Sequence, residues 1–272
     1  MIRFRRIADQ NYLKTQYRNA SNLNTRIRLH KEFSTNKYGW HRWLFEQINI
    51  PPQGRVLELG CGAGNLWLDN FDRIPAGLKI ILSDFSEGIL EQVQKKLAIS
   101  CIFFQFMKID AQFIPFENAS FDIVIANHML YHLTELDKAL SEIKRVLKPT
   151  GRFYASTSGR NHMKELSDLA RRFDSRLASL VRLTSDTFKI ENGAAQLANF
   201  FASISFYRYS DSLIVTDACQ LIQYILSGRI KLSPDKQLEF ARFVEQELKA
   251  NDGKFYIRKD LGVFESNNIL SS

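Results

Sequence analysis

Three glycines stand at alternate positions, 60, 62 and 64, directly after an apolar run in the stretch RVLELGCGAGNLW. Glycine adopts positive φ without strain and carries no Cβ, so a turn of this kind lets a ligand lie against bare backbone. The amide N–H groups of such a turn suit a carboxylate or phosphate, and its carbonyl groups suit an ammonium. One carboxylate, Glu58, stands just before the turn. The stretch therefore predicts recognition of a ligand that carries charged groups.

Two classes of ligand suit a glycine turn that follows a strand. A dinucleotide site has the spacing G-x-G-x-x-G, and the third glycine here comes one residue earlier. In such sites an acid about 20 residues further on binds a ribose, and Asp84 lies at that separation. Because Asp84 would serve either class, the spacing alone leaves both open.

The elements around the turn predict how these side chains are positioned. Strand-like runs at 55–59, 79–83, 103–109, 121–127 and 151–157 alternate with helical patterns. This alternation is typical of an α/β fold, a doubly wound parallel sheet with helices on both faces. Ligands of such sheets bind at the carboxyl ends of the strands. We therefore expect the residues at the ends of the predicted strands to form the border of a binding site: Gly60, Asp84, Asp110, Asn127 and Thr157/Ser158.

The regular alternation of strand-like runs with helical patterns ends after residue 158. We expect a single domain over 1–272, without repeats or long linkers. It comprises an N-terminal helical lid (1–50), a cofactor-binding core (51–158), a helical insertion that caps the substrate (159–199), and strands and helices that complete the sheet (200–266). Two strand-like segments, KFYIRK and LGVFES, close the chain.

The composition is ordinary for a globular enzyme, apart from a net charge of +8. Basic residues crowd the first 31 positions, which suits a polyanionic partner, although an exposed, solvated helix is the simpler explanation. The three cysteines lack paired spacing and indicate reduced thiols. No apolar run approaches the roughly 20 residues of a membrane helix. We expect a cytoplasmic protein that does not enter a membrane and has no metal site.

The glycine stretch resembles the first motif of class I S-adenosylmethionine-dependent methyltransferases. The resemblance continues in ILSDFSEGIL, KIDAQFIPFENASFDIVIANHMLYHL and EIKRVLKPTGRFYAS, and covers residues 55–158 in order. It looks closest to the ubiquinone/menaquinone-type branch and to small-molecule methyltransferases. The resemblance implies a Rossmann-like, mostly parallel seven-stranded sheet with an antiparallel C-terminal strand, and S-adenosylmethionine as cofactor.

The resemblance also implies roles for individual residues. Asp84 would bind the ribose hydroxyls, Asp110 would accept from the adenine amino group, and the Ala111 N–H would bind the adenine. Phe85 is placed to cover an adenine face, although a core position suits it equally. Glu58 would meet the cofactor ammonium or accept from loop N–H groups. The predicted cofactor-binding residues are Glu58, Gly60, Cys61, Gly62, Gly64, Asp84, Phe85, Asp110, Ala111 and Asn127.

The stretch NHMLYHL follows the fourth strand and should face the transferred methyl group. His128 and His132, with Tyr131 between them, are the candidate base or acceptor-positioning groups. Packing at a helix end is the simpler explanation of His132. A metal pair is disfavoured because no third ligand is apparent. Tyr17, Trp40 and His162 are the candidate acceptor contacts.

We therefore expect a bacterial methyltransferase, monomer or homodimer, that acts on a small molecule. The chain lacks the Asn/Asp-Pro-Pro-aromatic run of enzymes that methylate planar nitrogens, since Asn127 is followed by His128 and Met129. An RNA or translation-component methyltransferase is the first alternative, favoured by the pI near 9.4 alone. A catalytically silent S-adenosylmethionine-binding partner protein is the second, and a nicotinamide oxidoreductase is more distant.

Overall fold

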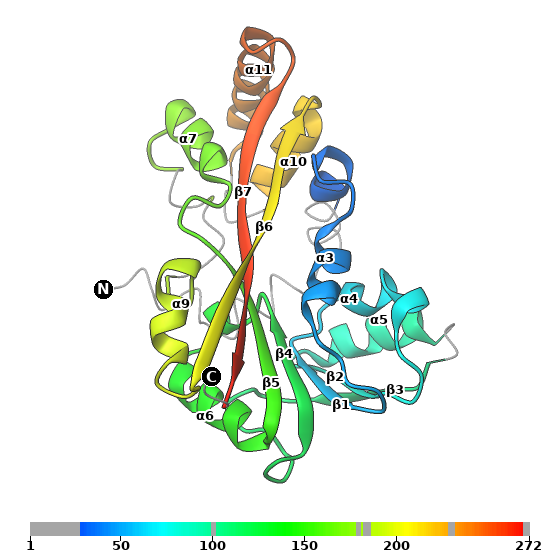
Figure 1. Ribbon diagram of the computed structural model, residues 1–272. Helices are drawn as coiled ribbons and strands as arrows, with labels where there is room; N and C mark the ends of the chain where they lie inside the picture. The colour runs from blue at the N-terminus through cyan, green and yellow to red at the C-terminus, as the bar shows by residue number, and fades with distance from the viewer. Residues whose placement is uncertain (1–27, 99–101, 178–180, 182–185, 228–231, 269–272) are drawn as a thin grey trace.

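One seven-stranded sheet organises the chain, as shown by a computed structural model that describes residues 28–98, 102–177, 181, 186–227 and 232–268 (Figure 1). The strand order is β3-β2-β1-β4-β5-β7-β6. The first five strands are parallel, and β7 runs antiparallel to both β5 and β6. The predicted fold class is thus confirmed. The strands are β1 (Arg55–Leu59), β2 (Lys79–Asp84), β3 (Phe104–Lys108), β4 (Phe121–Asn127), β5 (Leu147–Ser158), β6 (Ser203–Val215) and β7 (Phe255–Asn267).

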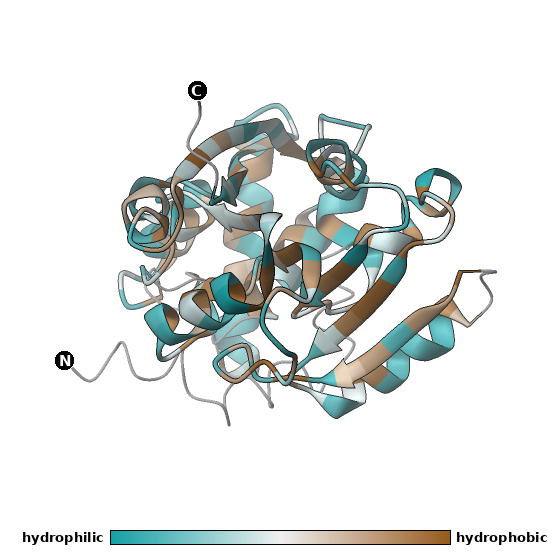
Figure 2. Ribbon diagram, turned by 60° about the horizontal axis from the view of Figure 1, so that its bottom comes forward, coloured by the Kyte–Doolittle hydropathy of each residue, from teal (hydrophilic) through white to brown (hydrophobic). Residues whose placement is uncertain are grey.

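Helices cover both faces of this sheet because the central strands are apolar on both sides (Figure 2). One face packs against α3 (Trp40–Gln47), α4 (Asn65–Leu68) and α5 (Glu87–Leu97). The other packs against α6 (Leu136–Val146) and α9 (Ile190–Leu197). Two short 3₁₀ helices, Phe71–Arg73 and Leu130–His132, lie in connecting loops.

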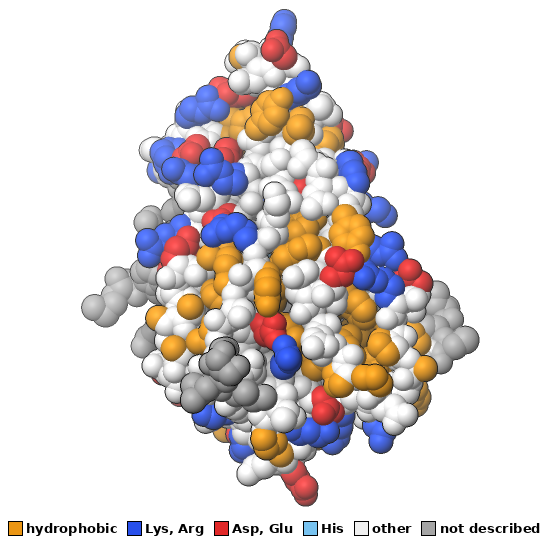
Figure 3. Space-filling model, viewed as in Figure 1, with side chains coloured by type: hydrophobic (Ala, Val, Ile, Leu, Met, Phe, Trp, Pro, Cys, Tyr) orange, Lys and Arg blue, Asp and Glu red, His pale blue; other side chains and the backbone are white. Residues whose placement is uncertain are grey.

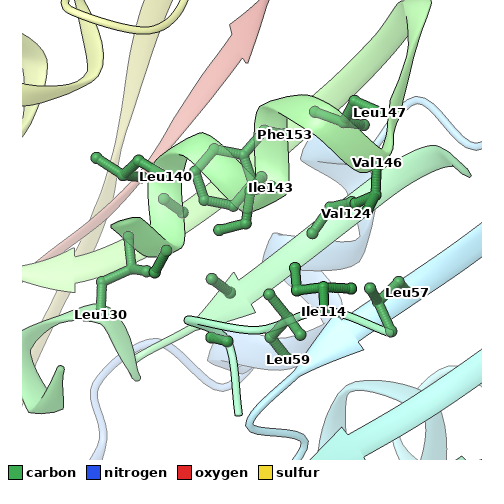
Figure 4. Packing of buried hydrophobic residues seen from close by; sticks show 14 of the residues in the cluster. Leu57, Leu59, Ile114, Val124, Leu130, Leu140, Ile143, Val146, Leu147 and Phe153 are labelled. Atoms are coloured by element: carbon green, nitrogen blue, oxygen red, sulfur yellow. The ribbon is translucent and has the colours of Figure 1, made fainter. Parts of the chain in front are cut away.

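The apolar face of α6 has the spacing that the sequence predicts. Leu140, Ile143 and Val146 point from the helix onto Val124 and Phe153 of the sheet (Figure 4). Each of these side chains is completely buried, and full burial of one such side chain is worth about 1.5–3 kcal/mol. The packing of α6 therefore fixes β4 and β5 through a buried apolar core.

Three element boundaries differ from the sequence-based expectation. The apolar spacing of LDKALSEIKRVL, followed by Pro149 to Gly151, predicts a helix that stops at the proline. The observed helix ends earlier, at Val146, and β5 begins at Leu147, because Leu147 already pairs with Phe121 of β4. The two predicted closing strands form one strand, β7, whose pairing with β6 is unbroken. The run FFASISFYRY predicts a strand over 200–209, and the observed strand runs instead over 203–215.

The strands β6 and β7 extend beyond the rest of the sheet as a two-stranded ribbon (Figure 1). β5 ends at Ser158 opposite Leu261, whereas the β6–β7 ladder continues to the pair Val215–Phe255. On this extension pack α7 (Lys164–Phe173), α10 (Ala218–Leu226) and α11 (Pro234–Ala250) around their own apolar cluster. We call the extended ribbon with these three helices the arm.

The residues proposed as a single substrate cap, 159–199, are divided between the two regions. Leu166 and Leu169 of α7 join the apolar cluster of the arm, whereas Leu197 of α9 joins the cluster beneath the central strands. The N-terminal segment also reaches the arm, since Ser34 forms a β-bridge with Leu213. The role of these segments as lids and caps stays a prediction.

Candidate functional site

A cavity of about 390 Å³ opens at the carboxyl ends of β1, β2 and β4. This is the point where the strand order reverses, because β1 lies between β2 and β4, and such switch points are where doubly wound sheets bind ligands. Every predicted cofactor-binding residue except Gly64 lines this cavity, together with His128, Tyr131 and His132. The structure thus gathers residues that lie as far apart in the chain as 58 and 132.

Glycine is needed at positions 60, 62 and 64 for different structural reasons. All have positive φ, at 68°, 54° and 73° for Gly60, Gly62 and Gly64. A Cβ on Gly64 would lie 2.4 Å from Val93 of α5, and one on Gly60 would lie 2.9 Å from Met129. A Cβ on Gly62 would meet no atom within 4 Å. Gly64 therefore serves helix packing, whereas Gly62 leaves open space along the cavity wall.

Asp84 braces the glycine turn as well as facing the cavity. Its carboxylate accepts from the Gly62 N–H at 3.2 Å and from the Ser86 N–H at 2.9 Å. Burial raises the pKa of Asp84, and these backbone donors oppose that shift. The sequence suggests Ser86 as the N-cap of the helix that follows it. Ser86 does precede α5, but its side chain makes no capping hydrogen bond. The contact between Asp84 and the turn was not foreseen from the sequence.

Glu58 is buried behind the turn. Its carboxylate accepts from the indole Nε1–H of Trp67 at 2.6 Å, a partner that the sequence analysis did not consider. Burial raises the pKa of Glu58 to about 8, although the Trp67 hydrogen bond acts the other way. A buried carboxyl of this kind would be stabilised as an anion by a cation placed in the cavity.

Asp110 sits at the centre of a hydrogen-bonded loop. Its Oδ1 accepts from the backbone N–H of Gln112 at 2.9 Å and from the Gln112 amide at 3.0 Å. The other end of that amide, Oε1, accepts from Thr134 and from the Glu135 N–H, both at 3.0 Å. Gln112 thereby ties the β3 loop to the loop that holds His132. This link spans two motifs, and no local pattern marks it.

His128 and His132 follow β4 and line the cavity. His128 has a positive φ of 54°, and its N–H donates to Ser156 Oγ at 3.0 Å. Burial lowers the pKa of His128 to about 3 and that of His132 to about 4. The ring of Tyr131 packs edge-on against His132 at 4.6 Å. Both imidazoles are therefore neutral at neutral pH, the form that can accept a proton.

The predicted acceptor contacts are not gathered at one place. The ring of Trp40 lies 5.1 Å from that of His128, at the border of the cavity. His162 lies outside it, and its Nδ1 accepts from the Asp260 N–H at 3.2 Å. Tyr17 lies outside the described residues. Within the described part of the chain, no group of three or more His, Cys, Asp or Glu residues could hold a metal.

Known proteins match the same part of the chain. Residues 57–155 match the family described as "Methyltransferase domain". The core of this chain is a methyltransferase domain. It is 35% identical over 118 residues to the demethylmenaquinone methyltransferase of Symbiobacterium thermophilum, covering 42% of this chain and 46% of that protein. The ubiquinone/menaquinone biosynthesis C-methyltransferase UbiE of Teredinibacter turnerae is 30% identical, with the same coverage of both chains.

The predicted resemblance to methyltransferases is thus confirmed for this part of the chain. The chain spans about half the length of the curated relatives it matches. Among solved structures, the YcgJ protein of Bacillus subtilis aligns with a TM-score of 0.57 over 84% of this chain and 98% of that one, at 16% identity. Phosphoethanolamine N-methyltransferase 2 of Haemonchus contortus, in complex with S-adenosyl-L-methionine, gives 0.60 over 95% and 59%, also at 16%. At such low identities these likenesses show the fold.

Proposed function

We propose that the chain binds S-adenosylmethionine in this cavity and transfers its methyl group to a small-molecule acceptor by in-line displacement. The observation that carries the proposal is the open space at Gly62, a left-handed glycine that lines the cavity and on which a Cβ would meet no atom within 4 Å. In this assignment the turn amides bind the cofactor carboxylate and Glu58 lies toward its ammonium. Asp84 would hold the ribose, and Phe85, Asp110 and Ala111 would hold the adenine.

The bound cofactor supplies an activated methyl group on a sulfonium, and S-adenosylhomocysteine is left when the acceptor takes the methyl. The chain's main task is then to hold the acceptor atom in line with that bond. An acceptor that keeps its proton also needs a base. The neutral imidazoles of His128 and His132, which line the cavity, are the groups that can take this proton.

A nucleic-acid substrate finds little support in the described surface. Lys and Arg side chains are interspersed with Asp and Glu on the face shown in Figure 3, without one continuous basic patch there. Several basic residues are committed to ion pairs, among them Arg145 with Glu142 and Arg73 with Glu46. Most of the basic N-terminal stretch lies outside the described residues.

No helix in the described ranges is long and apolar enough to span a membrane. A cytoplasmic location in a bacterium, and a monomer or homodimer, remain our proposals.

The test has a binding arm and a turnover arm. Thermal unfolding is measured with S-adenosylmethionine, S-adenosylhomocysteine and NAD, followed by labelled-methyl transfer into a metabolite extract. We expect stabilisation by the first two and a labelled small molecule. Asp84→Ala should abolish the stabilisation, whereas Asp122→Ala, at the opposite end of the sheet and paired with Lys148, should keep it. Stabilisation by NAD alone would refute the proposal, and stabilisation without transfer would favour the silent binding protein.

A further inference from the structure

A third histidine lines the cavity besides His128 and His132: His41, which comes from α3. One buried amide fixes its backbone beside α4 and the glycine turn. The Asn70 side chain donates to the His41 carbonyl oxygen at 3.1 Å and to the Leu66 carbonyl oxygen at 2.7 Å. Leu66 also lines the cavity, two residues after the last glycine of the turn. The helix α3 therefore supplies a titratable side chain to the part of the wall that the turn and α4 form.

The imidazole of His41 is oriented by a carboxylate that lies outside the cavity wall. Its Nδ1 lies 3.0 Å from Oδ2 of Asp69, the residue that follows α4 and does not line the cavity. Because a carboxylate accepts, Nδ1 carries the hydrogen, and Nε2 lies on the other side of the ring. Within the described ranges Nε2 has no hydrogen-bond partner, and the side chain is 26% exposed. This nitrogen is therefore available to a ligand in the cavity.

The charged groups of the cavity wall are mostly of one sign. Three carboxyl groups line the cavity: those of Glu58, Asp84 and Asp110. No lysine or arginine among the described residues lines it. Burial lowers the pKa of His128 to about 3 and that of His132 to about 4, so neither carries a charge at neutral pH. An imidazolium at His41 would instead keep contact with water and with the Asp69 carboxylate. Of the side chains in this wall, His41 is thus the one placed to supply a positive charge.

The methyl donor carries a negative charge at one end. S-adenosylmethionine has a carboxylate and an ammonium on its methionine portion, and the proposed function places both beside the glycine turn. Backbone N–H groups of the turn would give the carboxylate hydrogen bonds but no net charge. Since three carboxyl groups line the same cavity, a cation beside the turn would offset the repulsion that the ligand carboxylate meets. His41 lies in that position.

We propose that His41, held in place by Asp69, binds the amino-acid carboxylate of S-adenosylmethionine and thereby selects methyl donors that carry this group. With the ligand bound, Nδ1–H donates to Asp69 and Nε2–H donates to the ligand carboxylate. The carboxylates on either side favour the doubly protonated ring that makes both bonds, and the second proton comes from the solvent. No covalent bond changes. This inference rests on the proposed function and adds a specificity-determining residue to that site, with Asp69 as its positioning residue.

Calorimetric titration of the whole chain at pH 7 tests this assignment with two ligands that differ only in the carboxylate. They are S-adenosylhomocysteine and its decarboxylated analogue, S-adenosyl-3-thiopropylamine, which keeps the nucleoside and the ammonium. His41→Gln should weaken S-adenosylhomocysteine about 10-fold, the scale of one charge-assisted hydrogen bond, and should change the affinity for the analogue by less than about 2-fold. Binding of the analogue also shows that the variant is folded.

Two further variants locate the effect. Arg42→Gln removes the neighbouring cation of α3, which pairs with Asp72 and does not line the cavity, and should leave both affinities within about 2-fold. Asp69→Asn keeps an acceptor for the Nδ1–H of His41 but removes the counter-charge. It should weaken S-adenosylhomocysteine about 3-fold and leave the affinity for the analogue unchanged.

The outcomes separate this inference from the proposed function. Equal losses of the two ligands in His41→Gln would overturn the assignment, because His41 would then only support the shape of the cavity. An equal loss of S-adenosylhomocysteine in Arg42→Gln would also overturn it, since the general charge of α3 would then explain the effect. Unchanged binding of S-adenosylhomocysteine in His41→Gln would remove this inference alone. If the natural chain bound neither ligand, the proposed function itself would fail.

Discussion

Polar residues are placed differently around the cavity and in the arm. At the strand ends around Gly62 and Asp84, polar groups border a cavity and hold each other through backbone N–H donors. In the arm, Asp211 and Lys259 are buried among rings and apolar helices, and each neutralises the other. The polar groups at the cavity can form hydrogen bonds with a ligand. Lys259 and Asp211, by contrast, must stay paired, because each would otherwise be a buried charge without a counter-charge.

Breaking the buried pair gives the largest effect that we expect on stability. Asp211→Ala removes the counter-charge of Lys259 together with the acceptor of Ser34 and Asn36. Removal of one partner from a buried pair costs about 3–5 kcal/mol. Urea unfolding measures this loss. Asp72→Ala, which breaks the exposed pair with Arg42, should cost under about 1 kcal/mol. Similar losses in both variants would contradict the contrast between the two environments.

Glu58 offers a pH-dependent test on the cofactor side. Its pKa is 4.5 in the unfolded chain and about 8 in the folded one. Between these values the unfolded state releases a proton that the folded state keeps, so Glu58 lowers stability increasingly as pH rises through this window. Glu58→Gln keeps an acceptor for Trp67 and should stabilise the ligand-free protein by up to a few kcal/mol at pH 8, with almost no change near pH 4.5.

A carboxylate in the half-buried ion pair of Glu142 with Arg145 should show the opposite sign. The hydrogen bond from Arg145 lowers the pKa of Glu142, so Glu142→Gln should destabilise the protein above about pH 4.5. Thermal unfolding of both variants from pH 4.5 to 8 makes the comparison. If Glu58→Gln gave a gain independent of pH, burial of its charge would not be the cause.

Gly64 and Gly62 of the turn separate helix packing from ligand approach. Gly64→Ala combines left-handed strain with a contact of 2.4 Å on Val93, and should cost about 2–4 kcal/mol. Gly62→Ala keeps only the strain, about 1–2 kcal/mol, and instead should weaken S-adenosylmethionine by intruding on the cavity wall. Unfolding in urea gives the first quantity and calorimetric titration the second. Equal stability losses with unchanged cofactor affinity would place Gly62 outside the binding surface.

The gathering of residues around the cavity at the strand ends could be predicted because its signals are local. Glycines, Asp84 and Asp110 each follow an apolar run, and parallel pairing brings such strand ends to one edge of the sheet. The contacts that escaped prediction join distant positions. Examples are Gln112 with Thr134, Trp40 with Tyr209, and the bond from the His128 N–H to Ser156. They depend on register and helix placement, which short-range patterns do not specify, and the arm consists almost wholly of such contacts.

Of the substitutions around the cavity, we expect those of His128 and His132 to change cofactor affinity least. His128→Ala and His132→Ala should each change S-adenosylmethionine affinity by less than about 3-fold, because neither residue is assigned to a cofactor contact. Their folded pKa values, about 3 and 4, lie below the ordinary 6.5, so both imidazoles are already unprotonated at pH 7. If one is the base, the rate of methyl transfer should be flat from pH 6 to 8 and should collapse only in that residue's variant. Full turnover in both variants would show that neither imidazole is the base.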